Sequence, residues 1–247
     1  MKVSIITVTY NSASTLEKTI LSVINQTYKN IEFIIIDGKS SDGTLAIIEK
    51  YNHAISKFVS EKDKGIYDAL NKGIAMASGD VIGILHSDDF FTDDNVITKI
   101  VQQFTHQQCD ALYADLYYVS KDNTNKIIRK WKSGELKSNS FLYGWMPPHP
   151  TFFVKKDIYN KYGAFDLNFK TSADYELMLR LLYRYKVKAG YLPEYIIKMR
   201  MGGQSNVTTK NRIIANIEDR KTWEVNGVKP YFFTLFLKPL RKITQFL

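Results

Sequence analysis

The sequence predicts an α/β fold with a mixed, mostly parallel central sheet and helices on both faces. Strand-like and helix-like segments alternate through about the first ninety residues, and such alternation requires crossovers between parallel strands. The apolar run Val81 to Leu85 is too short for an ordinary helix and is typical of a strand buried on both faces. Two adjacent carboxylates, Asp88 and Asp89, follow it, at the sheet edge where ligands of open α/β sheets bind.

The first half of the chain alternates strand patterns with helix patterns. The strand patterns are Val3 to Thr9, Ile31 to Ile36, a short run around Val59, and Val81 to Leu85. Helices are expected after Ser14, over residues 44–52 and over residues 65–78. Ser14 is expected to cap the first of these helices, and Glu17 to complete its capping box.

After Asp89 the pattern changes, and antiparallel strands are expected to complete a mixed sheet. The predicted elements are a helix over 94–104, strands over 111–119 and 126–131, a loop with one helical turn over 132–143, a strand over 151–154, an amphipathic helix over 171–185 and a basic helix over 208–224. Ser172 or Asp174 is expected to cap the amphipathic helix.

Composition limits the classes of function. The single cysteine, Cys109, excludes an intrachain disulfide and a cysteine-based zinc cluster, and it is compatible with a reducing cytoplasm. No signal peptide is recognised, and no apolar stretch reaches the ~18 residues of a transmembrane helix. The net charge of +9 predicts an anionic partner: nucleic acid, nucleotide phosphates or an acidic lipid surface. No nucleic-acid-binding module is recognised, so no nucleic-acid partner is expected.

Polar side chains gather where the predicted parallel strands end. They are Thr9, Tyr10 and Asn11; Asp37 and Ser40; Asp63; and Asp88 and Asp89. Adjacent carboxylates repel each other unless a positive charge lies beside them, and Mg²⁺ or Mn²⁺ carrying substrate phosphates is such a charge. The alternative is a solvated loop whose carboxylates only cap the next helix. No dinucleotide-binding or P-loop glycine motif occurs.

Three later segments offer site residues. Trp145 and His149 belong to an aromatic, proline-rich stretch that either walls a ligand pocket or packs on the core. Asp174 and Glu176 begin the late amphipathic helix, where a carboxylate is either a general base or a partner of the helix dipole. A loop with Gly202, Gly203, Gln204 and Ser205 is expected to close over phosphates.

The last stretch, from Lys229 to Leu247, alternates aromatic and aliphatic bulk with cations. This composition favours an interfacial segment whose apolar side enters the headgroup region while its cations face anionic lipid. The alternative is a tail helix that packs on its own domain or on a second subunit.

Taken together, five stretches make the chain resemble the inverting family 2 glycosyltransferases of the GT-A fold, in particular bacterial enzymes of surface-polysaccharide biosynthesis. They are SIITVTYN, IEFIIIDGKSSDGT, SEKDKGIYDALNKGIAMASGD, HSDD and SADYELMLRL. The resemblance covers about Met1 to Ser205. It implies a Rossmann-like nucleotide-diphospho-sugar transferase domain over 1–205, with a nucleotide-binding half at 1–89 and an acceptor-binding half at 90–205, and leaves 206–247 as a basic amphipathic C-terminal helical segment.

The resemblance also implies site roles. Donor binding would fall to Thr9, Tyr10, Asn11, Asp37, Ser40, Asp63, Gly65, Asp68, Asn71 and Asp88, acceptor binding to Trp145 and His149, and binding of Mn²⁺ or Mg²⁺ to Asp89. Asp174 would deprotonate the acceptor hydroxyl. Two departures stand out: His86 replaces the first carboxylate of a D-x-D motif, and Tyr175 follows Asp174 directly, so Glu176 is a rival base.

The function expected is metal-dependent transfer of a hexose or N-acetylhexosamine from a nucleotide-diphosphate sugar, a UDP-sugar by preference. The acceptor would be a hydroxyl of a lipid-linked molecule or a glycan, and the protein would work in the cytoplasm as a peripheral protein at the inner face of the plasma membrane. One alternative is a non-catalytic sugar-nucleotide-binding protein. The other is a nucleotidyltransferase, which should carry a glycine-rich basic loop after its first strand, where TYNSAST stands.

Overall fold

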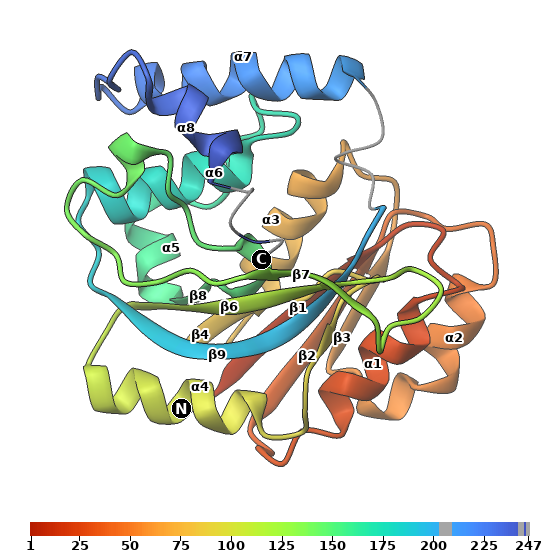
Figure 1. Cartoon of the computed structure of the whole chain (residues 1–247). Coiled ribbons are helices and arrows are strands. Elements are labelled where there is room, and N and C mark those ends of the chain that lie inside the picture. The colour runs from red at the N-terminus through yellow and green to blue at the C-terminus, as the bar shows by residue number, and fades with distance from the viewer. Residues whose placement is uncertain (203–208, 242–244, 246–247) are drawn as a thin grey trace.

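The computed structural model describes residues 1–202, 209–241 and 245, with the side chains of 209–213 left aside. In this part of the chain a single nine-stranded sheet, strongly curled, runs through the molecule in the order β3-β2-β1-β4-β8-β6-β9-β5, with β7 paired to β6 (Figure 1). Helices lie on both faces of the sheet, as the sequence predicts.

The first four strands are parallel, as expected from the alternating pattern. They are β1 (Val3–Thr9), β2 (Ile31–Asp37), β3 (Lys57–Ser60) and β4 (Val81–Ile84). The helices that connect them are α1 (Leu16–Ile24), α2 (Thr44–Lys50) and α3 (Ile66–Met76), and a short 3-10 turn, η1 (Asn52–Ala54), precedes β3. Successive side chains of β1 point to opposite faces: Ile5 packs in one core cluster with Leu16 of α1, and Ile6 in the other with Leu70 of α3.

The second half makes the sheet mixed. Its elements are β5 (Phe90–Phe91), α4 (Val96–Gln107), β6 (Ala111–Val119), β7 (Ile127–Trp131), η2 (Phe141–Tyr143), η3 (His149–Thr151), β8 (Phe153–Lys155), α5 (Lys156–Tyr162) and β9 (Ala189–Arg200). β8 is antiparallel to both β4 and β6, whereas β9 is parallel to β6. At the join, a Cβ on Gly83 would lie 2.2 Å from Cε1 of Phe153, so a residue without a side chain is needed there.

The predicted late helix is present but changes its winding. It begins as α6 (Ala173–Met178) and continues as the π-helical segment η4 (Leu179–Arg184). Above it lie α7 (Thr209–Val225) and α8 (Thr234–Leu240), as Figure 1 shows. Trp223 of α7 is fully buried and joins the core cluster that also holds Tyr175, so α7 packs on the second half of the fold. The predicted boundary between residues 205 and 206 lies outside the described residues.

The predicted helix caps are wrong. The N-cap of α1 is Thr15, which makes no side-chain cap, and Glu17 instead accepts hydrogen bonds from Lys50 Nζ at 2.7 Å and Tyr51 Oη at 2.8 Å. A tertiary ion pair therefore replaces the local capping box. The N-cap residue of α6, Ser172, likewise makes no side-chain cap, and a distant carboxylate described below takes that place. Within the residues described, no helix is both long and apolar enough to cross a bilayer.

Candidate active site

The carboxyl ends of β1 and β2 bring the first group of predicted donor residues together. Thr9 and Asp37 are partners in the parallel register, and both are buried. Asp37 accepts hydrogen bonds from the backbone amide and hydroxyl of Ser40 and from the hydroxyl of Ser60, at 3.0, 2.5 and 2.6 Å. Asp37 thus fixes the loop that follows β2. Thr9 Oγ1 is buried without a hydrogen-bond partner among the described residues.

Tyr10 is exposed beside these strand ends and lies close to the buried Gly38. The Tyr10 side chain is 56% exposed although it is aromatic. A Cβ on Gly38 would lie 3.3 Å from the Tyr10 ring and 2.7 Å from Oδ2 of Asp63, so all three residues meet closely. The next residue, Asn11, ties Tyr10 to the Asp37 loop, because its backbone amide donates a hydrogen bond to Ser40 Oγ at 2.8 Å. An exposed ring held this way offers a stacking face to a planar base.

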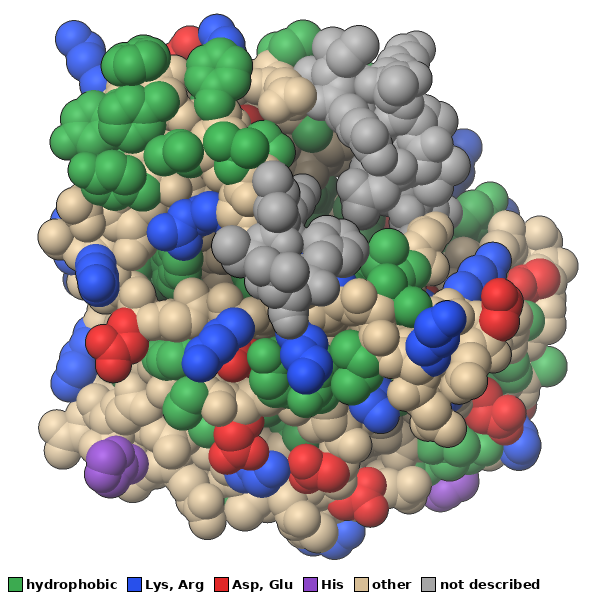
Figure 2. All heavy atoms as spheres, viewed as in Figure 1, with side chains coloured by type: hydrophobic (Ala, Val, Ile, Leu, Met, Phe, Trp, Pro, Cys, Tyr) green, Lys and Arg blue, Asp and Glu red, His purple; other side chains and the backbone are tan. Residues whose placement is uncertain are grey.

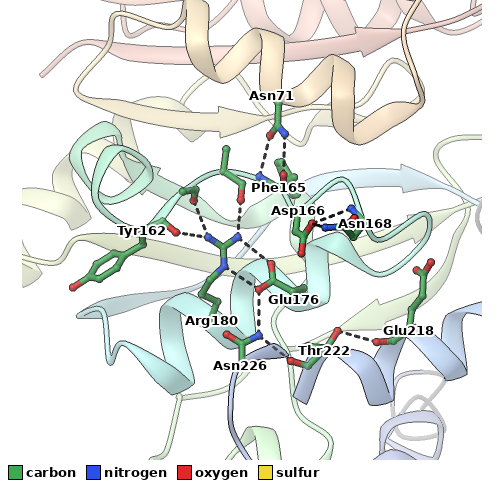
Figure 3. A network of polar contacts seen from close by, with 12 residues as sticks. Asn71, Tyr162, Phe165, Asp166, Asn168, Glu176, Arg180, Glu218, Thr222 and Asn226 are labelled. Atoms are coloured by element: carbon green, nitrogen blue, oxygen red, sulfur yellow. Dashed lines mark hydrogen bonds and ion pairs between the residues drawn. The ribbon is translucent and has the colours of Figure 1, made fainter. Parts of the chain in front are cut away.

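The predicted donor residues of α3 have different positions. Asp63 accepts a hydrogen bond from the amide of Gly65, the N-cap of α3, at 2.9 Å. Asp68 accepts from the amide of Lys64 at 3.0 Å, and this bond holds the pKa of Asp68 below its usual value. Asn71 makes two side-chain hydrogen bonds to the backbone of Phe165 (Figure 3). Its Nδ2 donates to the Phe165 carbonyl and its Oδ1 accepts from the Phe165 amide, both at 2.9 Å. Asn71 therefore joins α3 to the segment before α6.

The two carboxylates after β4 differ in burial. Asp88 is half-buried, and its backbone carbonyl accepts a hydrogen bond from the Arg200 guanidinium at the end of β9. Asp89 is 1% exposed, and neither of its carboxylate oxygens has a hydrogen-bond partner among the described residues. Burial raises the pKa of Asp89 well above its usual range, the Asp88 charge adds to the rise, and Arg200 opposes it.

These two carboxylates fit a divalent cation. A buried carboxylate whose oxygens lack donors is stabilised by a cation, and Mg²⁺ typically needs only one or two protein carboxylates when phosphates supply the other oxygens. Within the described residues there is no group of three or more His, Cys, Asp or Glu side chains able to hold a metal by themselves. The two carboxylates therefore suit a cation whose remaining ligands are phosphate or water oxygens rather than protein side chains.

A second cluster brings together residues that are far apart in the sequence. The rings of His86 and His149 lie 6.0 Å apart, and the His149 ring meets Phe165 edge-on at 5.5 Å. Burial lowers the pKa of His86, while the charges of Asp88 and Asp174 both raise it. Burial likewise lowers the pKa of His149 to about 3, so this ring is neutral at physiological pH. Asp174 thus lies in the same electrostatic environment as the carboxylates after β4.

Asp174 and Glu176 have separate surroundings, although both begin α6. Asp174 is partly exposed, accepts a hydrogen bond from Tyr67 Oη at 3.3 Å, and has its pKa raised by burial against the opposing charge of Lys238. Glu176 is 3% exposed and forms a two-point ion pair with Arg180, with both N···O distances 2.9 Å (Figure 3). Arg180 also donates to the backbone carbonyls of residues 162, 163 and 164. Glu176 is therefore part of a buried structural network.

Of the two predicted acceptor residues, Trp145 is packed into the core. Its Nε1 donates to the Ser133 carbonyl at 2.7 Å, and its ring lies edge-on to Tyr113 and Phe141 at 5.5 and 5.4 Å. His149, 8% exposed, lies nearer the cluster with His86. The predicted phosphate-closing residues Gly203, Gln204 and Ser205 lie outside the described residues.

Sequence reasoning missed several residues of this site. Tyr67 lies within a stretch that carried the family resemblance, and its place one turn before Asn71 was the available signal. Arg200, Glu218 and Lys238 come from β9, α7 and α8, and no local pattern marks them. Lys238 pairs with Asp219 at 2.7 Å and lies over the Tyr175 ring at 3.6 Å, one residue from Asp174.

Comparisons with known proteins agree with this geometry. Residues 4–165 match the family model described as Glycosyl transferase family 2. An uncharacterized glycosyltransferase of Mycobacterium tuberculosis is 34% identical over 180 residues, which are 72% of this chain and 68% of the relative. A glycosyltransferase of PGL/p-HBAD biosynthesis from Mycobacterium bovis is 24% identical over 219 residues, 87% of this chain and 83% of that protein.

Solved structures show the same fold. S. aureus TarS 1–349 matches with a TM-score of 0.71 at 17% identity, covering 99% of this chain and 72% of that one, and it has also been solved with UDP and with UDP-GlcNAc. The mannosyltransferase PcManGT from Pyrobaculum calidifontis, in complex with GDP-Man and Mn²⁺, matches with a TM-score of 0.67 at 16% identity, covering 96% and 68%. The chain therefore belongs to glycosyl transferase family 2 and has the GT-A fold.

Proposed function

We propose that this protein is an inverting glycosyltransferase that moves a sugar from a nucleotide-diphosphate sugar to a hydroxyl of a lipid-linked or glycan acceptor. The observation that carries the proposal is a set of contacts that joins Asp174 to the residues after β4. Asp174 accepts a hydrogen bond from Tyr67, whose ring stacks on Phe165. Phe165 meets His149 edge-on, and the His149 ring lies 6.0 Å from that of His86. A donor-side carboxylate and a candidate base are thereby brought to one place from opposite halves of the fold. A single displacement needs this arrangement, because the base and the leaving group act on the same anomeric carbon.

The donor side is proposed to hold a UDP-sugar. Tyr10 would stack on the base, Thr9 and Asp37 would line the nucleoside pocket, and Asp88 would reach the ribose or the phosphates. TarS, solved with UDP and UDP-GlcNAc, supports a uridine nucleotide, whereas PcManGT with GDP-Man keeps guanosine open. Thr9 Oγ1, buried and without a partner among the described residues, is a ready hydrogen-bond donor for such a ligand.

Asp89, with Asp88 beside it, is proposed to hold Mn²⁺ or Mg²⁺. The cation supplies positive charge that stabilises the departing diphosphate. The unpartnered, buried oxygens of Asp89 support this assignment, as does the Mn²⁺ in the PcManGT complex. Arg200, which bonds the Asp88 carbonyl, adds a second positive charge on the same side of the site.

Asp174 rather than Glu176 is proposed as the general base. Asp174 is partly exposed and takes one hydrogen bond from Tyr67 Oη, so an oxygen remains for an acceptor hydroxyl. Both oxygens of Glu176 are engaged by Arg180. In the reaction the acceptor oxygen bonds to the anomeric carbon, its proton passes to Asp174, and the bond from that carbon to the phosphate oxygen breaks with its electron pair leaving on the nucleotide.

A membrane-bound acceptor is supported by the surface over the C-terminal helices. Exposed apolar side chains lie along the end of α7 and the segment into α8, with Phe232 89% and Phe236 64% exposed. Figure 2 shows hydrophobic side chains gathered over this part of the surface, with cations at its margin. We propose that this surface binds an anionic bilayer, since apolar side chains with flanking cations suit the headgroup region. The M. bovis relative of PGL/p-HBAD biosynthesis is consistent with a lipid acceptor.

The donor assignment can be tested by thermal unfolding with UDP, GDP and dTDP, each with and without Mn²⁺. A nucleotide at 100 times its dissociation constant stabilises the fold by ~2.7 kcal/mol. In a domain of this size that raises the midpoint by roughly 5 to 10 °C. We expect the largest Mn²⁺-dependent rise with UDP. No rise with any of the three nucleotides would refute a nucleotide site at the strand ends.

The membrane surface can be tested by sedimentation with vesicles that contain phosphatidylglycerol. A double variant, Phe232→Ser and Phe236→Ser, should lose most of the vesicle-bound fraction. Phe58→Ser on β3, where the side chain is 40% exposed, is the matched control. Point variants are preferable to deletion of the tail, because the α8 backbone packs on Gly144. Equal binding by the wild type and the double variant would refute this surface.

A further inference from the structure

We infer that Glu218 of α7 and Tyr67 of α3 are positioning residues that hold Asp174 through Thr171, and that α7 is thereby a working part of the catalytic centre. This inference rests on the proposed function, in which Asp174 is the base. It concerns a helix beyond the family match, which ends at residue 165.

Both carboxylate oxygens of Glu218 accept hydrogen bonds from the residues at the start of α6. Oε1 accepts a hydrogen bond from the amide of Lys170 at 2.8 Å. Oε2 accepts three more, from the amide and the hydroxyl of Thr171, both at 2.8 Å, and from the amide of Ser172 at 3.0 Å. Amides at the start of a helix lack partners within the helix, so a carboxylate there satisfies them and favours the helix dipole. Glu218 thus does from a distant helix what Ser172 was expected to do locally.

Thr171 carries this restraint to Asp174. Its amide and hydroxyl bond Glu218, while its carbonyl accepts a hydrogen bond from Tyr67 Oη at 3.0 Å. The same Tyr67 hydroxyl lies 3.3 Å from Oδ1 of Asp174. The Tyr67 ring is fixed in turn, because it stacks on Phe165 with centroids 5.4 Å apart. One continuous set of contacts therefore runs from α7 to the candidate base.

Tyr67 is suited to this place because it remains a donor. Burial raises the pKa of its hydroxyl, and the charges of Asp174 and Glu218 raise it further. The hydroxyl therefore stays protonated over the working pH range, and its single proton is shared between Oδ1 of Asp174 and the Thr171 carbonyl. An ionised carboxylate with a fixed donor on one oxygen presents its other oxygen in a defined direction, which is what proton abstraction requires.

The face of α7 that meets α6 carries buried polar residues at helical spacing, and the series continues into the residue that follows the helix. Glu218, Thr222 and Asn226 follow one another four residues apart, and all are at most 8% exposed. Asn226, the residue that follows α7, donates from Nδ2 to Glu176 at 3.2 Å (Figure 3). Together with the Glu218 contacts, this gives α7 and its C-terminal end two points of contact with α6. The first point lies at the start of α6, beside Asp174, and the second belongs to the buried Glu176 network. The two points allow a positioning residue, Glu218, to be compared with a structural one, Asn226, in the same segment of the chain.

The test uses the whole chain with Mn²⁺ and measures nucleotide release from UDP-GlcNAc, UDP-glucose, UDP-galactose and GDP-mannose. Water is the acceptor in this assay: its oxygen bonds to the anomeric carbon and its proton passes to Asp174. Glu218→Gln and Tyr67→Phe should each lower kcat about 10- to 100-fold, as expected for a misplaced catalytic group. The donor KM should change less than about 2-fold, because neither residue contacts the donor side. The double variant should be no slower than the worse single variant, since residues that act through one set of contacts are not additive.

Two variants, one in α7 and one at the residue that follows it, serve as controls. Glu224→Gln makes the same charge change at an exposed position, and Asn226→Ala removes buried hydrogen bonds outside the Glu218 contacts. At temperatures below their unfolding midpoints, both variants should have a kcat within about 2-fold of the wild-type value. Asn226→Ala should nevertheless unfold at a lower temperature than the wild type. Additive losses from Glu218→Gln and Tyr67→Phe, or a wild-type kcat in Glu218→Gln, would overturn the inference. Retained activity in Asp174→Asn would instead overturn the proposed function.

The pH profile separates positioning from loss of stability. The titratable groups that interact with Asp174 are Tyr67 from α3, Lys238 from α8, His86 after β4 and Tyr118 from β6. The Tyr67 hydrogen bond lowers the pKa of Asp174. Removing that bond in Tyr67→Phe should move the acid limb of kcat to higher pH. A lower kcat with an unmoved acid limb would contradict the contact between Tyr67 and the base.

Discussion

Paired substitutions in α6 should separate catalysis from stability. We expect Asp174→Asn to abolish most of the activity with little effect on the fold, and Glu176→Gln to do the reverse. Both changes neutralise one carboxylate with almost no change of shape. The contrast arises because Glu176 is buried and paired with Arg180, whereas Asp174 is partly exposed and accepts one hydrogen bond from Tyr67.

The size of the stability effect follows from the Glu176 network. Neutralising Glu176 leaves the Arg180 guanidinium, whose side chain is 13% exposed, without its counter-charge. Breaking a buried ion pair in this way costs about 3 kcal/mol or more. In a domain of this size that lowers the unfolding midpoint by roughly 6 to 12 °C. Below that midpoint, we expect kcat to stay near the wild-type value.

Neutralising Asp174 should not lower the free energy of unfolding, in contrast to neutralising Glu176. Burial raises the pKa of Asp174 above its ordinary value of 3.8, so its ionisation stabilises the unfolded chain more than the folded one. Its contribution to stability is present below that ordinary pKa and is lost as pH rises through the raised value. Asp174→Asn should therefore be as stable as the wild type at pH 7, or more so. Loss of a general base lowers kcat by about 10²- to 10⁴-fold.

Nucleotide release and thermal unfolding at pH 5 to 8, on both variants and the wild type, check these expectations. Wild-type kcat should fall as pH drops, because protonated Asp174 accepts no proton. An active Asp174→Asn, or an inactive but fully stable Glu176→Gln, would refute the assignment of the base.

Three further predictions concern the donor side and the core. Asp89→Asn should lose the Mn²⁺-dependent part of the thermal shift with UDP, while any metal-independent part remains; an unchanged Mn²⁺ effect would place the cation elsewhere. Tyr10→Ala should weaken UDP binding about 5- to 150-fold, since stacking of a base on an aromatic ring contributes ~1–3 kcal/mol, and calorimetric titration would show it. Gly83→Ala should destabilise the fold by about 1 to 3 kcal/mol in guanidinium unfolding, because the new Cβ meets the Phe153 ring at the join of β4 and β8; a neutral result would mean that β8 shifts freely.

The local patterns of the chain were sufficient for the architecture of the first half. Buried β-branched runs joined by amphipathic helices allow only a parallel sheet covered on both faces, and the structure has this arrangement. The strand-end positions of Thr9, Asp37, Asp88 and Asp89 followed directly, because parallel strands place their carboxyl ends along one edge. Periodicity and strand direction are local properties, so the sequence alone determines them.

Tertiary contacts decided what these side chains do. Asp174 and Glu176 look equivalent in sequence, but residues two apart on a helix point about 200° apart, and only packing shows which one meets Arg180. Ser14 and Ser172 resemble caps, yet Glu17 pairs with Lys50 and the start of α6 is satisfied by Glu218.

The pairing of β8 between β4 and β6, and the docking of α7, also required the structure. Such contacts join segments separated by tens of residues, and no periodicity within either segment encodes the partner. The sequence by itself determined the fold class and the edge at which the carboxylates gather. Only the tertiary structure decided which carboxylate is available for chemistry, because burial and hydrogen-bond partners are properties of the packed chain.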